Sequence, residues 1–82
     1  MDQRIFELNL SVEATSLYLL AVSLADGGAP LDWENIQRFW NGTESQLEQA
    51  WAELLQRQVT EQDPQGKLRI KPFWEWLPQE KS

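Results

Sequence analysis

Two of the residue types that most often carry out catalysis are absent from this 82-residue chain. It has no histidine and no cysteine, so the usual general base near neutral pH and the thiolate nucleophile are both missing. A serine or threonine nucleophile needs a positioned base, and no lysine or carboxylate stands in a motif that would supply one. Carboxylates alone could bind a metal ion, but no motif for such a site is present. We therefore expect a protein that is not an enzyme and that holds no cofactor.

A short segment near the C-terminus places three cations at alternate positions. Lys67, Arg69 and Lys71 are separated by Leu68 and Ile70, so all three would lie on one face of an extended strand. Such a row could contact phosphate groups. The more ordinary interpretation is a solvated strand face that protects the edge of a sheet from aggregation.

Tryptophan is unusually frequent, with five residues in the chain. Trp33, Trp40 and Trp51 occupy core-side positions of helical patterns, and we expect them to pack in the interior. Trp74 and Trp76 lie beyond the cation-rich segment and would project to the same side of an extended chain. Two interpretations are open: the tail folds back over a small core, or the pair anchors a partner protein, because tryptophan is enriched in binding hot spots.

The charge balance is acidic, with 13 acidic residues, 7 basic residues and a formal net charge of -6 at pH 7. This charge opposes non-specific attraction to nucleic acid and to anionic lipid, although a local patch can override it. The first residues lack the pattern of a secretory signal, and the longest apolar run, at 17–25, is far shorter than the about 20 residues that span a bilayer. We expect a cytoplasmic protein that does not contact a membrane.

Apolar residues recur at helical spacing after Ser11, a plausible N-cap, until the glycine pair at 27–28 interrupts the pattern. This first predicted helix is apolar around most of its circumference, because Val12, Leu19 and Val22 lie away from its main stripe. It is therefore either the centre of a small domain or a helix that gives one face to a homodimer.

Two further helices are predicted. A short one follows Asp32 and ends before Asn41. The next begins at Thr43, which forms a capping-box signature with Gln46, and it continues to about Gln58. Its apolar stripe has the spacing of an amphipathic helix and consists of Leu47, Ala50, Trp51, Leu54 and Leu55.

After this helix the apolar pattern alternates, which indicates strands. Segments 59–62 and 67–71 flank the sequence DPQG, which has the residue preferences of a type I turn, and we predict a β-hairpin in which Gln62 pairs with Lys67. This register gives an apolar face that covers the helices, made up of Val59, Glu61, Leu68 and Ile70. The opposite face then holds Thr60, Gln62, Lys67, Arg69 and Lys71.

The order of these elements resembles the winged helix-turn-helix superfamily over roughly residues 10–70. The segments that carry the resemblance are LYLLAVSL, LDWENIQRFW, NGT, ESQLEQAWAELLQRQ and VTEQDPQGKLRI, for the first helix, second helix, turn, recognition-position helix and wing. The resemblance implies an α+β fold that is mainly α, with three helices and a small C-terminal β-hairpin as the wing. It also implies a single domain over residues 1–82, with a core at about 10–71 and an aromatic C-terminal tail at 72–82.

In that superfamily the third helix commonly enters the major groove of DNA, and the wing contacts the backbone or the minor groove. The outward face of the third helix here is uncharged, and a glutamine amide can read adenine through two hydrogen bonds. The resemblance therefore implies a DNA-facing set in which bases would meet Ser45, Gln49 and Gln56. Phosphates would meet Arg57, Lys67, Arg69 and Lys71.

The acidic residues of the third helix oppose this function. Glu44, Glu48 and Glu53 border its outward face and would approach a polyanion, and Arg57 is the only cation on the helix. We therefore favour a protein-protein interaction or assembly module that uses the acidic helix face, the apolar first helix or the tryptophan pair of the tail. The alternative is a dimeric DNA-binding regulator of transcription.

Overall fold

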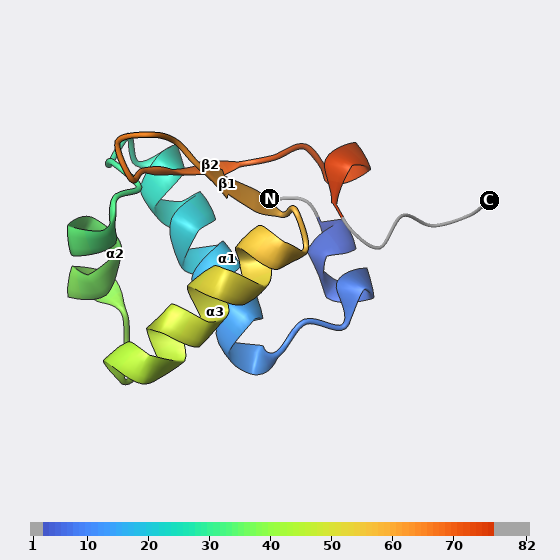
Figure 1. Cartoon of the computed structure of the whole chain (residues 1–82), viewed down its shortest axis with the longest axis horizontal. Coiled ribbons are helices and arrows are strands. Elements are labelled where there is room, and N and C mark those ends of the chain that lie inside the picture. Colours follow the sequence, from blue (N-terminus) through green and yellow to red (C-terminus); the bar gives the residue numbers. More distant parts are fainter. Residues whose placement is uncertain (1–2, 77–82) are drawn as a thin grey trace.

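The chain folds into three α-helices followed by a two-stranded hairpin, and the computed structural model describes residues 3–76 (Figure 1). The helices are α1 (Val12–Asp26), α2 (Trp33–Phe39) and α3 (Glu44–Gln56), and the antiparallel strands are β1 (Thr60–Gln62) and β2 (Leu68–Ile70). Two short 3-10 helices, η1 (Gln3–Leu8) and η2 (Phe73–Glu75), flank this unit and were not predicted. The fold class, mainly α with a small hairpin in a winged-helix-like layout, is confirmed. Residues 77–82 of the predicted tail lie outside the described residues.

Helix α1 begins and ends where the sequence predicts. The Ser11 hydroxyl accepts the backbone N–H three residues on (3.1 Å) and so satisfies a free donor of the first turn. At the other end Gly28 adopts a left-handed φ of 77°, and the Ala29 N–H donates to the Leu24 carbonyl (2.9 Å), which is a Schellman C-cap. Within residues 3–76, none of the helices combines the length and the apolarity that a membrane crossing needs.

The turn between α2 and α3 is held by local hydrogen bonds. Thr43 and Gln46 form the predicted capping box, in which each side chain accepts the backbone N–H of the other residue (both 3.1 Å). The Trp40 indole donates to the Thr43 carbonyl (3.1 Å). It also lies so close to Gly42 that an added Cβ would come within 2.9 Å of the indole nitrogen. Because Gly42 has no side chain, the Trp40 ring has room to pack against the turn.

The core lies mainly between α1 and α3, and the hairpin runs across them on one side (Figure 1). The three helical tryptophans pack as predicted, because Trp51 is buried and both Trp33 and Trp40 are half-buried against the core. The rings of Trp33 and Trp51 meet edge to face, with centroids 5.0 Å apart. The buried hydrophobic residues are Ile5, Ala14, Leu17, Tyr18, Ala21, Ile36, Leu47, Ala50, Trp51, Leu54, Val59, Leu68 and Trp76.

The predicted hairpin is present, but its predicted register is wrong by one residue. Gln62 pairs with Leu68 instead of Lys67. The reason is Gly66, whose left-handed φ of 87° follows the turn and adds one residue to the loop, as in a type I turn followed by a G1 bulge. The Asp63 carboxylate supports this loop by accepting two of its backbone N–H groups (3.0 and 2.9 Å).

This shift changes which side chains share a face of the hairpin. Thr60, predicted to face outward, is buried. Glu61, predicted to lie on the apolar face, is exposed opposite Arg69, and the two side chains form an ion pair (3.7 Å). The Leu68 N–H donates to the Leu31 carbonyl (2.8 Å), so the connection between α1 and α2 runs beside β2.

Candidate functional site

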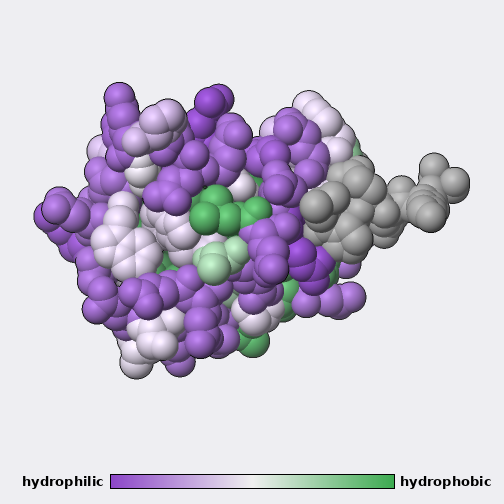
Figure 2. All heavy atoms as spheres, in the orientation of Figure 1, coloured by the Kyte–Doolittle hydropathy of each residue, from purple (hydrophilic) through white to green (hydrophobic). Residues whose placement is uncertain are grey.

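The outward face of α3 is exposed, as the sequence predicts. Ser45, Gln49 and Gln56 are all accessible to solvent, together with Ala52. This face carries no charge of its own. In the view of Figure 2 the surface of the molecule is largely hydrophilic, with a small apolar patch near the centre.

The three acidic residues that border this face do not behave alike. Glu44 and Glu48 are exposed, as expected. Glu53 is half-buried, and its carboxylate accepts both the backbone N–H of Ser11 (2.9 Å) and the Ser11 hydroxyl (2.8 Å). Glu53 therefore joins α3 to the N-terminal end of α1, and the expectation that it would approach a polyanion is corrected.

Arg57 lies on the same flank of α3 as Glu53 and not on the outward face. Its side chain is half-buried, and its Nη2 donates to the Leu8 carbonyl (3.2 Å) at the end of η1. The guanidinium thus holds the segment that precedes α1. The winged-helix resemblance assigns Arg57 to a phosphate contact, whereas in the structure its guanidinium is hydrogen-bonded within the domain.

The three cations of the wing also differ from one another. Lys71 is only 15% exposed, and its ammonium donates to the Gln58 side chain (2.7 Å) and pairs with Glu75 (3.5 Å). Arg69 is exposed but ion-paired with a carboxylate of β1. Lys67 is exposed, and its side chain has no ion pair within the described chain. The predicted row of three equivalent cations therefore reduces to Lys67 and Arg69.

The two tryptophans of the tail have opposite surroundings. Trp76 is 3% exposed, its ring meets that of Tyr18 edge to face (centroids 5.7 Å apart), and its indole donates to the Lys71 carbonyl (2.7 Å). Trp74 is 65% exposed. Among the aromatic ring pairs of residues 3–76, its ring contacts only that of Phe73, with centroids 5.3 Å apart. Residues 73–75 form a 3-10 turn and not an extended strand, so the two rings do not project to one side. Trp76 is a core residue, and its predicted role as a protein contact is corrected.

The first helix keeps part of its apolar surface in solvent. Val12 is 76% exposed and Leu19 is 37% exposed, whereas Val22 is half-buried. Val12 and Leu19 are seven residues apart and therefore share one side of α1. A homodimer through this side, one of the two expectations for this helix, stays a prediction.

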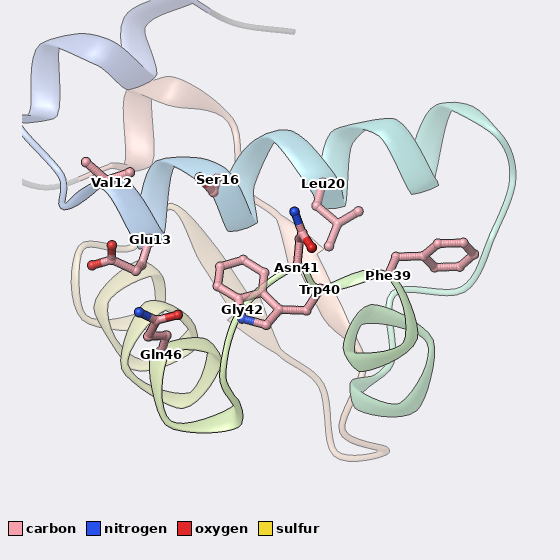
Figure 3. Close-up of a pocket in the computed structure, with 9 residues that line it drawn as sticks. All are labelled: Val12, Glu13, Ser16, Leu20, Phe39, Trp40, Asn41, Gly42 and Gln46. Carbon is pink, nitrogen blue, oxygen red and sulfur yellow. The ribbon is translucent and has the colours of Figure 1, made fainter.

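A cleft of about 300 Å³ opens between α1 and the turn that joins α2 to α3 (Figure 3). The residues of α1 that line it are Val12, Glu13, Ser16 and Leu20. The opposite side consists of Phe39, Trp40, Asn41, Gly42 and Gln46. In Figure 3 the Trp40 indole lies between α1 and the start of α3, and the Phe39 ring extends away from it.

Sequence reasoning did not find this cleft. Two signals were present: Val12 lies off the apolar stripe of its helix, and Trp40 directly precedes a tight turn at Asn41 and Gly42. Neither signal indicates that the two segments meet, because that requires the packing of α1 against the α2–α3 turn.

Comparisons with protein-family models, with curated proteins and with solved structures found no match for the chain. Among the side chains that the structure describes, no three or more His, Cys, Asp or Glu residues are grouped so as to hold a metal ion. The fold and the surfaces define a small domain of winged-helix-like layout. Its function has to be inferred from three exposed features: the outward face of α3, Trp74 and the cleft.

Proposed function

We propose that this chain is a non-catalytic module that binds another protein through a winged-helix-like scaffold. The observation that supports this most is the state of the four cations that the winged-helix resemblance assigns to phosphates. Arg57 and Lys71 make hydrogen bonds inside the domain, and Arg69 is ion-paired. Of these four, Lys67 alone makes neither a side-chain hydrogen bond nor an ion pair with another described residue.

Electrostatics make DNA a poor partner for this surface. A DNA-binding protein draws much of its affinity from cations that displace the counterions of phosphates. Here a phosphate contact by Arg57 or Lys71 would first break an internal hydrogen bond of a charged donor, worth roughly 1.5–3 kcal/mol. Glu44 and Glu48 would approach the same phosphates, and the formal net charge of -6 adds repulsion at longer range. A neutral or basic protein surface does not require these hydrogen bonds to break and is not repelled by the acidic residues.

Of the two tail tryptophans, Trp74 is the one that suits a protein contact. It is 65% exposed, and its ring is braced by Phe73 at a centroid distance of 5.3 Å. An exposed tryptophan gains a large apolar contact area on binding and loses few rotatable bonds, and this is why tryptophan dominates many binding hot spots.

The test is capture of a partner by the tagged full chain after cross-linking in its native cells. We expect the variant Trp74→Ala to lose at least about tenfold in capture, as for a hot spot, while its melting temperature is unchanged. Leu19→Ala is the control, because it shortens an exposed apolar side chain on a different element. Failure of the unaltered chain to capture any protein, or capture that is insensitive to Trp74→Ala, contradicts this assignment.

A DNA-binding regulator is the second candidate. The observation in its favour is that Gln49, Gln56 and Ser45 are exposed on α3 while Lys67 and Arg69 are exposed on the wing. In this function the glutamines would contact base edges and the two wing cations would contact phosphates. Direct titration with a DNA duplex separates the two functions.

A further inference from the structure

We propose that the cleft between α1 and the α2–α3 turn binds a basic amphipathic helix of a partner protein. An apolar side chain of that helix packs on Trp40, and a lysine or arginine pairs with Glu13; Figure 3 shows where these two residues lie in the cleft. This inference rests on the proposed function, because it names a second contact surface of the module and the chemical class of the partner.

The floor of the cleft is formed before any partner arrives. Trp40 is half-buried against the core, and its indole N–H is fixed by the hydrogen bond to the Thr43 carbonyl (3.1 Å). The ring also lies against Gly42, where a Cβ would come within 2.9 Å of the indole nitrogen. A ring held from two sides loses little conformational freedom on binding, and this lowers the entropic cost of association.

The apolar wall of the cleft runs along α1. Val12 is 76% exposed at the start of the helix, and Leu20 is half-buried two turns further on. Eight residues of helix separate them, or about 12 Å at 1.5 Å per residue. This is close to the span of apolar anchors at positions i, i+4 and i+7 of a helix laid in a groove. The wall therefore suits a helical segment better than a single inserted side chain.

Glu13 gives the cleft its charge. It is the one charged residue of the lining, and it is half-buried in the first turn of α1. The ion pairs between side chains of residues 5–76 do not include it. A carboxylate in the first turn is also stabilised by the helix dipole, so Glu13 has a local role in addition to the proposed one.

This charge selects among the possible occupants. A second copy of the chain would bring another Glu13 and a further formal charge of -6, and an acidic segment would meet the same repulsion. Ser16 and Asn41 offer hydrogen bonds to any partner and do not discriminate. A segment with lysine or arginine beside its apolar anchors is the one that complements both the apolar wall and the carboxylate.

The experiment uses two synthetic peptides of about 15 residues that share leucines at helical spacing and carry either lysine or glutamate at the polar positions. Each is titrated into the isotope-labelled full chain and followed by amide and indole NMR signals. We expect the lysine peptide to shift the signals of residues 12–20 and 40–46 and the indole signal of Trp40. The glutamate peptide should bind at least about tenfold more weakly. Equal binding of both peptides, or shifts confined to other elements, would overturn the proposal.

Variants separate the cleft from a general effect of charge. Val12→Ser and Glu13→Gln should each lower the affinity for the lysine peptide, the latter by about two- to fivefold as for an ion pair accessible to solvent. Glu48→Gln removes an exposed charge outside the cleft, and Trp74→Ala alters the other proposed contact; both should leave the affinity unchanged. Equal losses in Glu13→Gln and Glu48→Gln would show that net charge alone attracts the peptide.

The failure of this inference can be told apart from the failure of the proposed function. If the lysine peptide does not bind while Trp74→Ala still abolishes partner capture, the cleft assignment is wrong and the protein-binding function stands. If no protein is captured by the full chain, the proposed function fails whatever the peptide does.

Discussion

The outward face of α3 and the joint at its C-terminal end use their side chains in opposite ways. The outward face presents neutral residues to solvent, and none of its predicted contact residues is buried. Near the C-terminal end of the helix, the terminal joint connects α3, η1, α1 and the tail through contacts of buried or half-buried side chains. These contacts are Glu53 with Ser11, Arg57 with the Leu8 carbonyl, Lys71 with Gln58, and Trp76 with Tyr18 and the Lys71 carbonyl.

Residue type alone therefore does not mark a contact surface in this chain. Arg57, Lys71 and Trp76 are chemically suited to bind phosphates or a partner, and each is used to hold the ends of the chain onto the core. The predicted contact residues that remain exposed are the neutral face of α3 with its acidic neighbours, Lys67 and Arg69 of the wing, and Trp74. The surface that is free to recognise a partner is therefore much less basic than the sequence suggests.

Truncation of Trp76 should have the largest effect. We expect Trp76→Ala to lower the free energy of unfolding by about 3–5 kcal/mol, because it removes a buried ring and leaves a cavity against Tyr18. Trp74→Ala should change it by less than about 0.5 kcal/mol, as for an exposed residue. Thermal and urea unfolding would measure both. If Trp76→Ala does not fold, Trp76→Phe should fold with a smaller loss, and equal effects at the two positions would contradict the comparison.

An intermediate effect is expected at Glu53. Glu53→Ala removes two hydrogen bonds from Ser11 to a carboxylate and should destabilise the fold by about 1.5–3 kcal/mol. Glu48→Ala, which removes an exposed acid from the same helix, should stay within about 0.5 kcal/mol of the unaltered chain. Urea unfolding of the two variants makes the comparison. Similar losses in both would mean that Glu53 does not hold the joint.

The smallest effect on stability is expected in the wing. Replacement of Lys67 and Arg69 by alanine should change the free energy of unfolding by no more than about 1 kcal/mol, since both are exposed and the pair of Arg69 with Glu61 is solvated. If DNA were a partner, the same changes would reduce the salt dependence of its affinity by about 0.9 for each lost phosphate contact. If the chain binds protein and not DNA, we expect no salt-dependent DNA binding, either with or without these changes.

Local signals allowed most of the fold to be predicted. The caps at Ser11, Asp32 and Thr43 and the apolar stripe of α3 depend on residues within one or two turns, and the structure reproduces each of them. The predicted hairpin register was wrong because the loop is one residue longer than the predicted turn. Gly66, with its left-handed φ, supplies the additional residue. Since side chains alternate along a strand, this single residue moved Thr60 and Glu61 to the opposite faces.

The candidate site was harder to predict because it depends on contacts between distant segments. The hydrogen bond of Glu53 to Ser11 joins residues 42 apart, and that of Arg57 to Leu8 joins residues 49 apart. Helical periodicity places these side chains on a flank of α3 but does not say what covers that flank. The short 3-10 turn that buries Trp76 and exposes Trp74 likewise has no periodic signal over three residues.

Our proposed function requires that α3 and the wing, within residues 3–76, do not form a phosphate-binding face. Amide-resolved NMR titration of the labelled full chain with a mixed-sequence DNA duplex tests it most directly, at low salt, where electrostatic attraction is strongest, and again near 0.15 M. We expect no shifts in either condition. Shifts confined to α3 and residues 60–71 that weaken as salt is raised would contradict it and would identify an electrostatically held DNA surface.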